Sequence, residues 1–240
     1  MPTFQRHITG AQAVIDTLKT LGQPTAEVIA GNTNGQIETM WHYATEVGKE
    51  LMSEYEWAFS RQELTLTLDG SITYDLPDDF NGFIGSSAWN RTTAFPVSGD
   101  FKPQVWQALK ANNVLGTLNI VYRLLTDQLE LLQDPGDSQE VVLPYFSRGW
   151  CRDESGNLQD NLIADTDVVL FDEILFKVAL KRKWLIENKF DTGRVEQEYT
   201  AALNKAKARD TTAQTLSLAP ARGAVFISVA NVPETGYGST

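Results

Sequence analysis

The sequence predicts an α+β fold in which helices at both ends of the chain flank a β-rich block. Apolar residues recur at helical spacing before residue 58 and again after residue 168, whereas from residue 63 they alternate with a period of two. Each predicted helix has a single apolar face, so we expect the flanking helices to pack together as one bundle. The expected segments are the first bundle helices (1–62), a β-rich insertion (63–167), the last bundle helices (168–210) and an extended tail (211–240).

Composition excludes several classes of protein. The 240 residues are 42% hydrophobic, which is too apolar for a mostly disordered chain. No apolar run approaches the 18 residues of a transmembrane helix, and the N-terminus lacks the basic and apolar regions of a signal peptide. Cys151 is the only cysteine, which suits a reducing compartment. A net charge of −11 is unfavourable for gripping nucleic acid.

The N-terminal segment predicts two helices. The first covers 9–21, with Thr9 as its N-cap and Gly22 and Pro24 as its stop. Residues 24–34 form a linker, and a longer helix follows at 35–58 because its apolar residues lie on one face.

The β-rich block begins with a predicted hairpin. A strand at 63–68 turns at Asp69-Gly70 and returns over 72–76, because glycine accepts the positive φ of a tight turn. Pro77 ends the return strand. Residues 78–102 read as irregular, with Trp89 and Phe95 as buried anchors.

The rest of the block predicts a short helix and further strands. The helix covers 103–112, with Val105, Trp106 and Leu109 facing inward. A second hairpin (116–125 and 128–133), a turn at 134–137, a strand at 139–147 and a turn at 153–157 follow.

Two more helices are predicted near the C-terminus, at 168–188 and 193–209, with Asp165 to Asp167 beside the first N-terminus. They carry the positive charge of the chain: residues 1–140 have a net charge of −10, whereas 177–209 have +5. This charge is either a solvated helix face or a contact with an acidic partner or ring neighbour. The candidate contact residues are Lys177, Lys181, Arg182, Lys183, Lys205 and Arg209.

The last thirty residues have a different composition. They contain two charged residues, Arg222 and Glu234, and short stretches in which apolar residues alternate. We expect this tail to bind a partner chain, for example by adding a strand to its sheet; the alternative is a terminal strand of the protein's own sheet. The candidate binding residues are Leu216, Leu218, Val225, Phe226, Ile227, Val229, Val232 and Tyr237.

No motif predicts catalysis, a cofactor or a metal. Phosphate-binding loops and the common hydrolase and zinc-protease motifs are absent. His7, His42 and Cys151 lack the spacing of a zinc site, and Glu54, Glu56 and Glu63 are the carboxylates from which a glycosidase pair would have to come. We therefore expect no catalytic residue, cofactor or metal.

Several short motifs together resemble a known family. They are Leu21-Gly22-Gln23-Pro24, Glu56-Trp57-Ala58-Phe59, Tyr74 to Phe80, Trp89-Asn90-Arg91, Pro96 to Gly99, Trp106 to Leu109, Ala164 to Asp167, Leu170 to Glu173 and Glu198 to Leu203. In this order and spacing, over residues 9–210, the chain resembles the head-to-tail adaptor proteins of short-tailed bacteriophages. The tail after residue 210 is outside the resemblance.

The resemblance implies a structural virion protein, assembled in the host bacterial cytoplasm. Family members form a ring, typically of twelve copies, between the portal and the tail nozzle or other tail proteins, and project a C-terminal tail into the portal. Genomic DNA passes through such a ring without specific binding, which an acidic lumen would favour. No membrane is involved. Two alternatives remain open: a cell-wall glycosidase of a phage tail, and a monomeric binding module with an intramolecular C-terminal strand.

Overall fold

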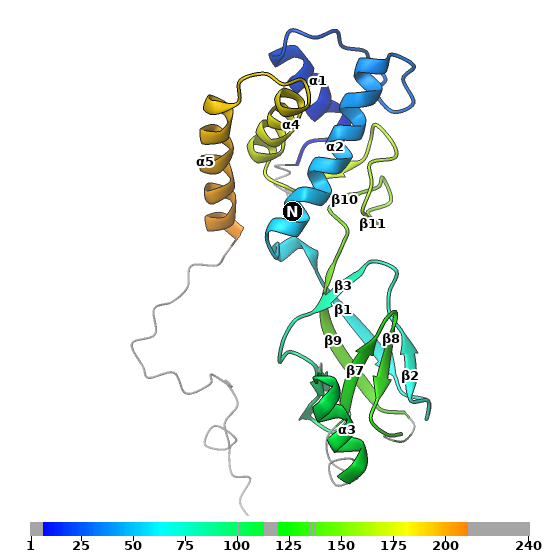
Figure 1. Cartoon of the computed structure of the whole chain (residues 1–240). Helices are drawn as coiled ribbons and strands as arrows, with labels where there is room; N and C mark the ends of the chain where they lie inside the picture. The colour runs from blue at the N-terminus through cyan, green and yellow to red at the C-terminus, as the bar shows by residue number, and fades with distance from the viewer. Residues whose placement is uncertain (1–6, 100, 113–119, 135, 137, 211–240) are drawn as a thin grey trace, which may run out of the picture.

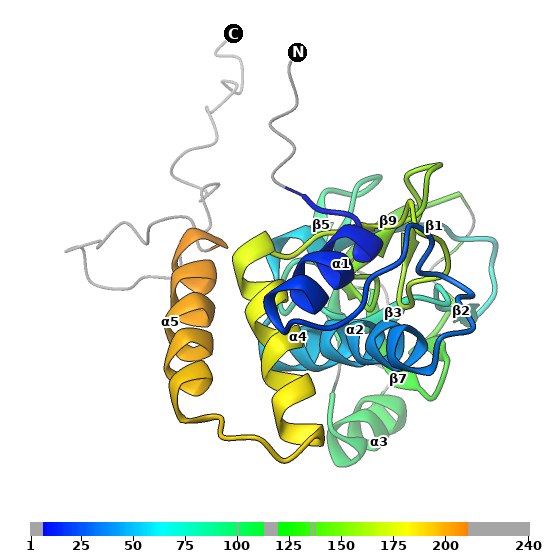
Figure 2. The same cartoon turned by 90° about the horizontal axis from the view of Figure 1, so that it is seen from above.

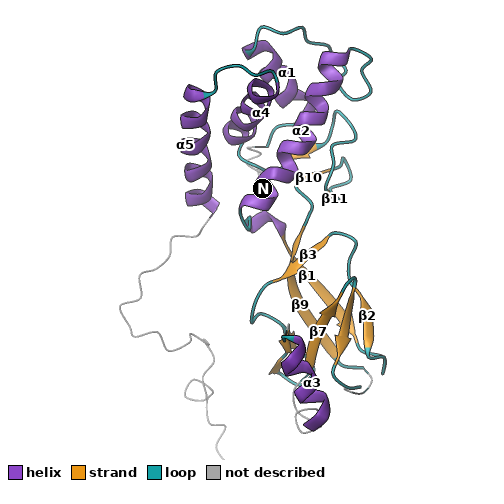
Figure 3. Cartoon of the chain, in the orientation of Figure 1, coloured by secondary structure: helices purple, strands orange, loops and turns teal. Residues whose placement is uncertain are grey.

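The computed structural model describes residues 7–99, 101–112, 120–134, 136 and 138–210, and these form a helical part and a β part arranged end to end (Figure 1). The α+β class is confirmed, with helices concentrated in one part and most strands in the other (Figure 3). The helices are α1 (Gly10–Thr20), α2 (Gly35–Glu54), α3 (Pro103–Asn112), α4 (Glu173–Glu187) and α5 (Gly193–Asp210), with a 3-10 turn at Ala58–Ser60. None of these helices is long and apolar enough to cross a membrane.

Local capping explains where the helices begin. The side chains of Thr9, Asn34 and Asp172 accept hydrogen bonds from the first backbone N–H groups of α1, α2 and α4. The predicted helix at 9–21 and its cap are confirmed. The predicted end of α2 at residue 58 is wrong, because Tyr55 is extended and the chain turns back until the Trp57 indole donates to the Leu51 carbonyl at 2.8 Å.

The start predicted for the next helix is also wrong. It begins at Glu173 instead of residue 168, because Val168–Val169 is strand β12 and pairs with β10 (Cys151–Arg152). The preceding aspartates cap loops, not the helix. The Asp165 carboxylate accepts from the Ile29 and Ala30 N–H groups, and the Asp167 carboxylate accepts from those of Ile163 and Ala164.

The core of the helical part lies where α1, α2 and α4 meet. Residues that follow the β part in the sequence complete this core. Trp150 lies directly before β10, Cys151 is its first residue, and Phe171 lies shortly before α4; all three are buried. The Trp150 ring packs directly over Gly48 of α2, where an added Cβ would lie 2.3 Å from the ring. A small sheet, β11 (Leu158–Gln159), β10 and β12, holds this segment against the helices.

Two sheets enclose a second core in the β part. The first joins β1 (Arg61–Thr67), β9 (Glu140–Ser147), β4 (Trp89–Asn90) and β5 (Phe95–Pro96), and β3 (Phe80–Phe83) also pairs with β9. The second joins β2 (Thr73–Asp75), β8 (Gln128–Leu131), β7 (Val121–Leu125) and β6 (Ser98–Gly99). The hairpin of β7 and β8 and the strand at 139–147 agree with prediction.

The first predicted hairpin is wrong. Gly70 does adopt a positive φ of 86°, but the strands on either side of it do not pair. Leu68 continues the pairing of β1 with β9, whereas the Ile72 carbonyl accepts from Leu131 of β8. The turn therefore carries the chain from one sheet to the other.

Trp89 and Phe95, predicted as anchors of the β part, are 39% and 46% exposed, and Val105, predicted to face inward, is 43% exposed, so these three predictions are wrong. Trp106 of α3, predicted to face inward, is fully buried, and Arg123 and Lys110 lie over its ring. Both cations also bind the carboxylate of Glu130, which is 7% exposed. Burial alone would raise the pKa of Glu130, but these hydrogen bonds outweigh it and hold the pKa below its usual value.

Candidate interaction surface

Helix α4 lies between α5 on one side and α1 and α2 on the other (Figures 1 and 2). Its basic side chains reach all three neighbours. Lys177 binds Asp16 of α1 at 3.5 Å, Lys183 binds α2, and Lys181 and Arg182 bind α5. The positive charge read from the sequence is therefore largely neutralised inside the chain by acidic residues of adjacent helices.

Lys183 is the centre of the contact between α4 and α2. Its ammonium group lies 2.7 Å from the Glu50 carboxylate, 3.2 Å from Glu46 and 3.8 Å from Glu187, and the side chain is 17% exposed. The hydrogen bond to Glu50, together with Glu46, raises the pKa of Lys183, and Lys183 in turn lowers the pKa of Glu46. Such a partly buried cluster contributes more than an isolated surface pair.

Helix α5 is held by apolar, polar and aromatic contacts: Ala206 is in the helical core, and the partly buried Ala202 and Leu203 pack against it. Only Val195 and Ala206 are buried on it. Arg182 of α4 pairs with Glu196 at 2.8 Å, and its guanidinium lies 4.9 Å from the centre of the Tyr199 ring. The Tyr199 hydroxyl donates to Glu54 at 3.0 Å, and burial together with this carboxylate raises the pKa of Tyr199.

The last described residue, Asp210, fixes the end of α5. Its carboxylate accepts a hydrogen bond of 2.8 Å from the Ala58 N–H, in the 3-10 turn directly before β1. One residue earlier, Arg209 pairs with Asp172, the N-cap of α4, at 3.0 Å. The root of the C-terminal tail is thereby placed at the junction of the helical and β parts. One signal in the sequence marks this position, since Asp210 is the last acidic residue before a segment that is almost free of charge.

The structure places the predicted contact residues unevenly. The eight tail residues, from Leu216 to Tyr237, lie outside the described residues. Five of the six basic residues have carboxylate partners in the chain; Lys205 is exposed on α5 and makes no ion pair with the part of the chain that the structure describes. A ring or partner contact through the other five would therefore compete with existing pairs.

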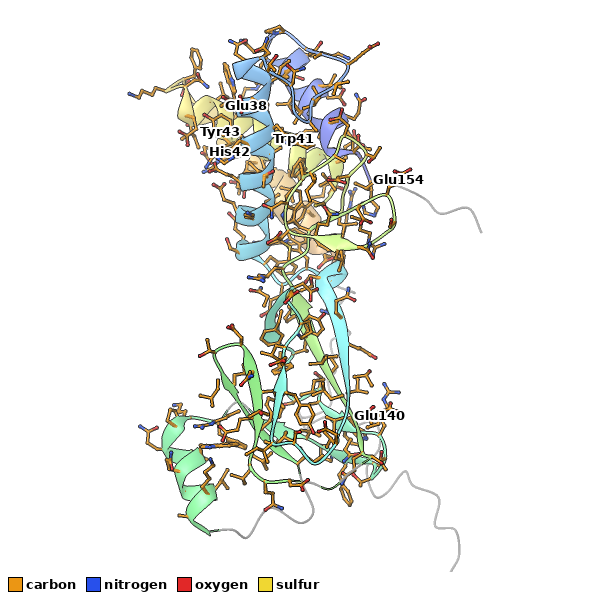
Figure 4. All side chains as sticks on the ribbon, turned by 90° about the vertical axis from the view of Figure 1, so that its right-hand side faces the viewer. Glu38, Trp41, His42, Tyr43, Glu140 and Glu154 are labelled. Atoms are coloured by element: carbon orange, nitrogen blue, oxygen red, sulfur yellow. The ribbon has the colours of Figure 1, made fainter. Side chains whose placement is uncertain are left out.

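Other candidate residues do not come together. His42 is exposed on α2 (Figure 4) and pairs with Glu46 at 3.2 Å, whereas its neighbours Trp41 and Tyr43 are partly buried against the helical core. Burial raises the pKa of the Cys151 thiol to about 12. Among the described residues, no group of three histidine, cysteine or acidic side chains could hold a metal ion.

The carboxylates considered for a glycosidase are dispersed along the chain. Glu54 accepts from Tyr199, Glu56 is exposed, and Glu63 pairs loosely with Arg91 at 3.8 Å. A general acid of this class needs a raised pKa, yet every described carboxyl group with a shifted pKa has it lowered. Nothing in this arrangement favours the glycosidase alternative.

A cavity of about 450 Å³ lies at the junction of the two parts. Asp78, Asp79, Arg148 and Asp160 line it together with the partly buried Gln159. The Arg148 guanidinium donates to the Asp78 carbonyl, and the Tyr145 hydroxyl donates to Asp79 at 3.0 Å. Both contacts lie within the β part, where they connect the segment before β3 to β9 and to Arg148 directly after it.

Comparison with known proteins gives no identification, because no protein-family model and no curated protein matches the chain.

Proposed function

We propose that the chain is a structural head-to-tail adaptor of a short-tailed bacteriophage. In this role it forms a ring, of about twelve copies in the family it resembles, that joins the portal to tail proteins and lets DNA pass. The observation that carries the proposal is the ordered series of motifs over residues 9–210. The C-terminal tail docks on the portal, and the protein acts in the virion without catalysis.

Two features of the described chain support this role. Helices from both ends of the sequence share one core, and the β part is inserted between them as an elongated projection (Figure 1). Such an elongated subunit can present its two ends to different partners. Asp210 fixes the root of the tail, so a tail of thirty residues, which spans at most about 100 Å, would leave every copy of a ring from the same place.

Because the basic residues of α4 are already paired, we place the proposed contact between ring copies on other residues. Lys177, Lys181, Arg182 and Lys183 already pair within the chain, so they stabilise the bundle in this proposal. Contacts between copies would use exposed apolar groups instead. Ile174, Ile186 and Phe190 at the two ends of α4 are 56%, 40% and 56% exposed.

Native mass measured with and without the portal protein tests the proposal. We expect a ring in the presence of portal, and we expect Ile227→Lys in the tail to prevent the complex, since it places a charge in an apolar docking strand. Thr212→Lys is the matched control, because it adds the same charge in the polar part of the tail. A chain that stays monomeric with portal would contradict the adaptor role, and portal binding by Ile227→Lys would contradict docking through the tail.

A further inference from the structure

Strand β1 forms a long free edge of the first sheet. It pairs with β9 over seven consecutive residues, Arg61 to Thr67, without a bulge, and within the described chain it has no partner on its other side. The other sheet edges are shorter: β2 has three residues, β6 has two, and β5 has two including Pro96. A long, regular edge strand without proline is an available template for a further strand.

Two apolar side chains of β1 are incompletely covered by the rest of the described chain. Leu64 and Leu66 point toward the second core but are only partly buried, while the alternate residues from Arg61 to Thr67 are exposed. A strand added beside β1 would cover the open flank of both leucines and would pair the outward N–H and C=O groups.

The tail begins close to this edge. Asp210 hydrogen-bonds the N–H of Ala58, three residues before β1 starts. The thirteen residues 211–223 can span at most about 45 Å. Strand β1 is about 23 Å long. The segment that follows residue 223 can therefore reach either end of β1 without any movement of α5.

Residues 224–230 have the composition that such an edge accepts. They read Ala-Val-Phe-Ile-Ser-Val-Ala, with β-branched or aromatic residues at four of seven positions and no charge. Pro233 follows shortly and prevents continuation of a strand. A segment of this kind is prone to aggregate unless it is covered. The edge of β1 therefore lacks a neighbouring strand, and a segment with the composition of a strand lies within reach of it.

We propose that residues 224–230 add to the free edge of β1 as a further strand of the same chain while the protein is free of partners. Val225, Ile227 and Val229 then lie on the face of Leu64 and Leu66. The inference does not depend on the adaptor function. If the tail binds a portal, it must first leave β1, so the intramolecular strand would shield the tail until a partner competes for it.

Amide hydrogen exchange of the full-length protein tests the proposal. We expect the β1 amides that point away from β9 to be protected in the native chain. Ile227→Pro should speed their exchange at least tenfold, because proline removes a donor and cannot sit in a ladder. The control Ala213→Pro lies in the polar part of the tail and should leave them unchanged. Absence of protection in the native chain, or equal effects of the two variants, would overturn the proposal.

Dilution identifies the chain that supplies the strand. Protection that is unchanged on tenfold dilution supports the tail of the same chain, whereas protection that falls on dilution assigns the strand to a second copy and overturns the intrachain proposal.

Disulfide trapping in the monomer provides a second measurement, and the native Cys151 does not interfere because it is buried. With Leu64 opposite Ile227, Thr65→Cys should cross-link to Ser228→Cys if the strands are parallel and to Phe226→Cys if they are antiparallel. Thr39→Cys, exposed near the start of α2, combined with Ser228→Cys is the control and should not react. Failure of both test pairs, or equal reaction of the control, counts against the added strand.

Discussion

Gly48 provides a sharp test of the packing between α2 and the segment that returns from the β part. An alanine Cβ at this position would lie 2.3 Å from the Trp150 ring, whereas carbon atoms in contact are normally about 3.5–4 Å apart. The ring cannot yield cheaply: it is fully buried, its Nε1 donates to the Asp160 carbonyl at 2.8 Å, and it packs on Phe171 and Phe176.

The expected magnitude follows from two opposing contributions. Overpacking of a rigid core costs about 3 kcal/mol at the upper end of the usual range. Replacing glycine by alanine within a helix recovers about 1 kcal/mol. We therefore expect Gly48→Ala to lower the free energy of unfolding by about 2 kcal/mol, which for a chain of this size lowers Tm by roughly 4–8 °C.

Thermal and urea unfolding followed by circular dichroism measure this effect. Gly35→Ala is the matched control, because it is also in α2 and nothing lies within 4 Å of the added Cβ. We expect the stability of Gly35→Ala to be close to that of the native chain. In a double-mutant cycle, Trp150→Leu should cost less in the Gly48→Ala background than alone. If Gly48→Ala were as stable as Gly35→Ala, the close packing of Trp150 on α2 would be refuted.

Three further predictions concern titratable groups. The lowered pKa of Glu130 stabilises the fold above its unfolded value of about 4.3, and this contribution is lost as the pH falls through the folded pKa; Glu130→Gln should therefore flatten the acid limb of a stability–pH curve. The raised pKa of Lys183 stabilises the fold below about pH 10.4 and is lost as the pH rises through the folded value. Lys183→Met should lower the free energy of unfolding by about 1 kcal/mol at pH 7, and by less at high salt. Unfolding measured at pH 7 and at pH 11 tests this: the loss should be smaller at pH 11, and an equal loss at both values would show that the charged cluster is unimportant. Because the thiol pKa is about 12, Cys151 should react with a disulfide reagent at pH 8 at least a hundredfold more slowly in the folded chain than in urea. The free energy of unfolding should also decrease above the unfolded thiol pKa of about 8.5. Rapid labelling of the folded chain would contradict the burial of Cys151.

The sequence predicts correctly those features that depend on a few neighbouring residues. Thr9 predicted the cap of α1, and Gly70 predicted a turn with positive φ. The partner of a strand is not a local property. Asp69 stabilises the turn itself, since its carboxylate accepts from the Ser71 N–H at 3.0 Å and the Tyr74 hydroxyl at 2.9 Å. Leu68, just before the turn, is nevertheless buried in the second core, and its backbone continues the pairing of β1 with the distant strand β9.

The same distinction explains the candidate surface. The net charge of 177–209 was readable, but its neutralisation by Asp16, Glu46 and Glu50 depends on contacts between residues more than a hundred positions apart. Among the aromatic residues, the inward position predicted for Trp106 is confirmed, whereas the anchor predicted at Trp89 is wrong. Trp89 lies on a two-residue strand near the sheet edge and stays partly exposed, whereas Trp150 returns to the helical core through a turn that no periodic pattern marks.

The pairing of Arg61 with Phe146 has a consequence for how the chain folds. Eighty-four residues separate these two neighbours, and closing a loop of that size costs roughly 4 kcal/mol of chain entropy. Pairing of β1 with β9 closes this loop and brings the end of α2 close to the chain that leads into α4. The helices then need little further loss of chain entropy to pack together. Formation of the β part would then accelerate assembly of the helical core, so that variants that weaken β1 against β9 slow refolding of helices they never touch.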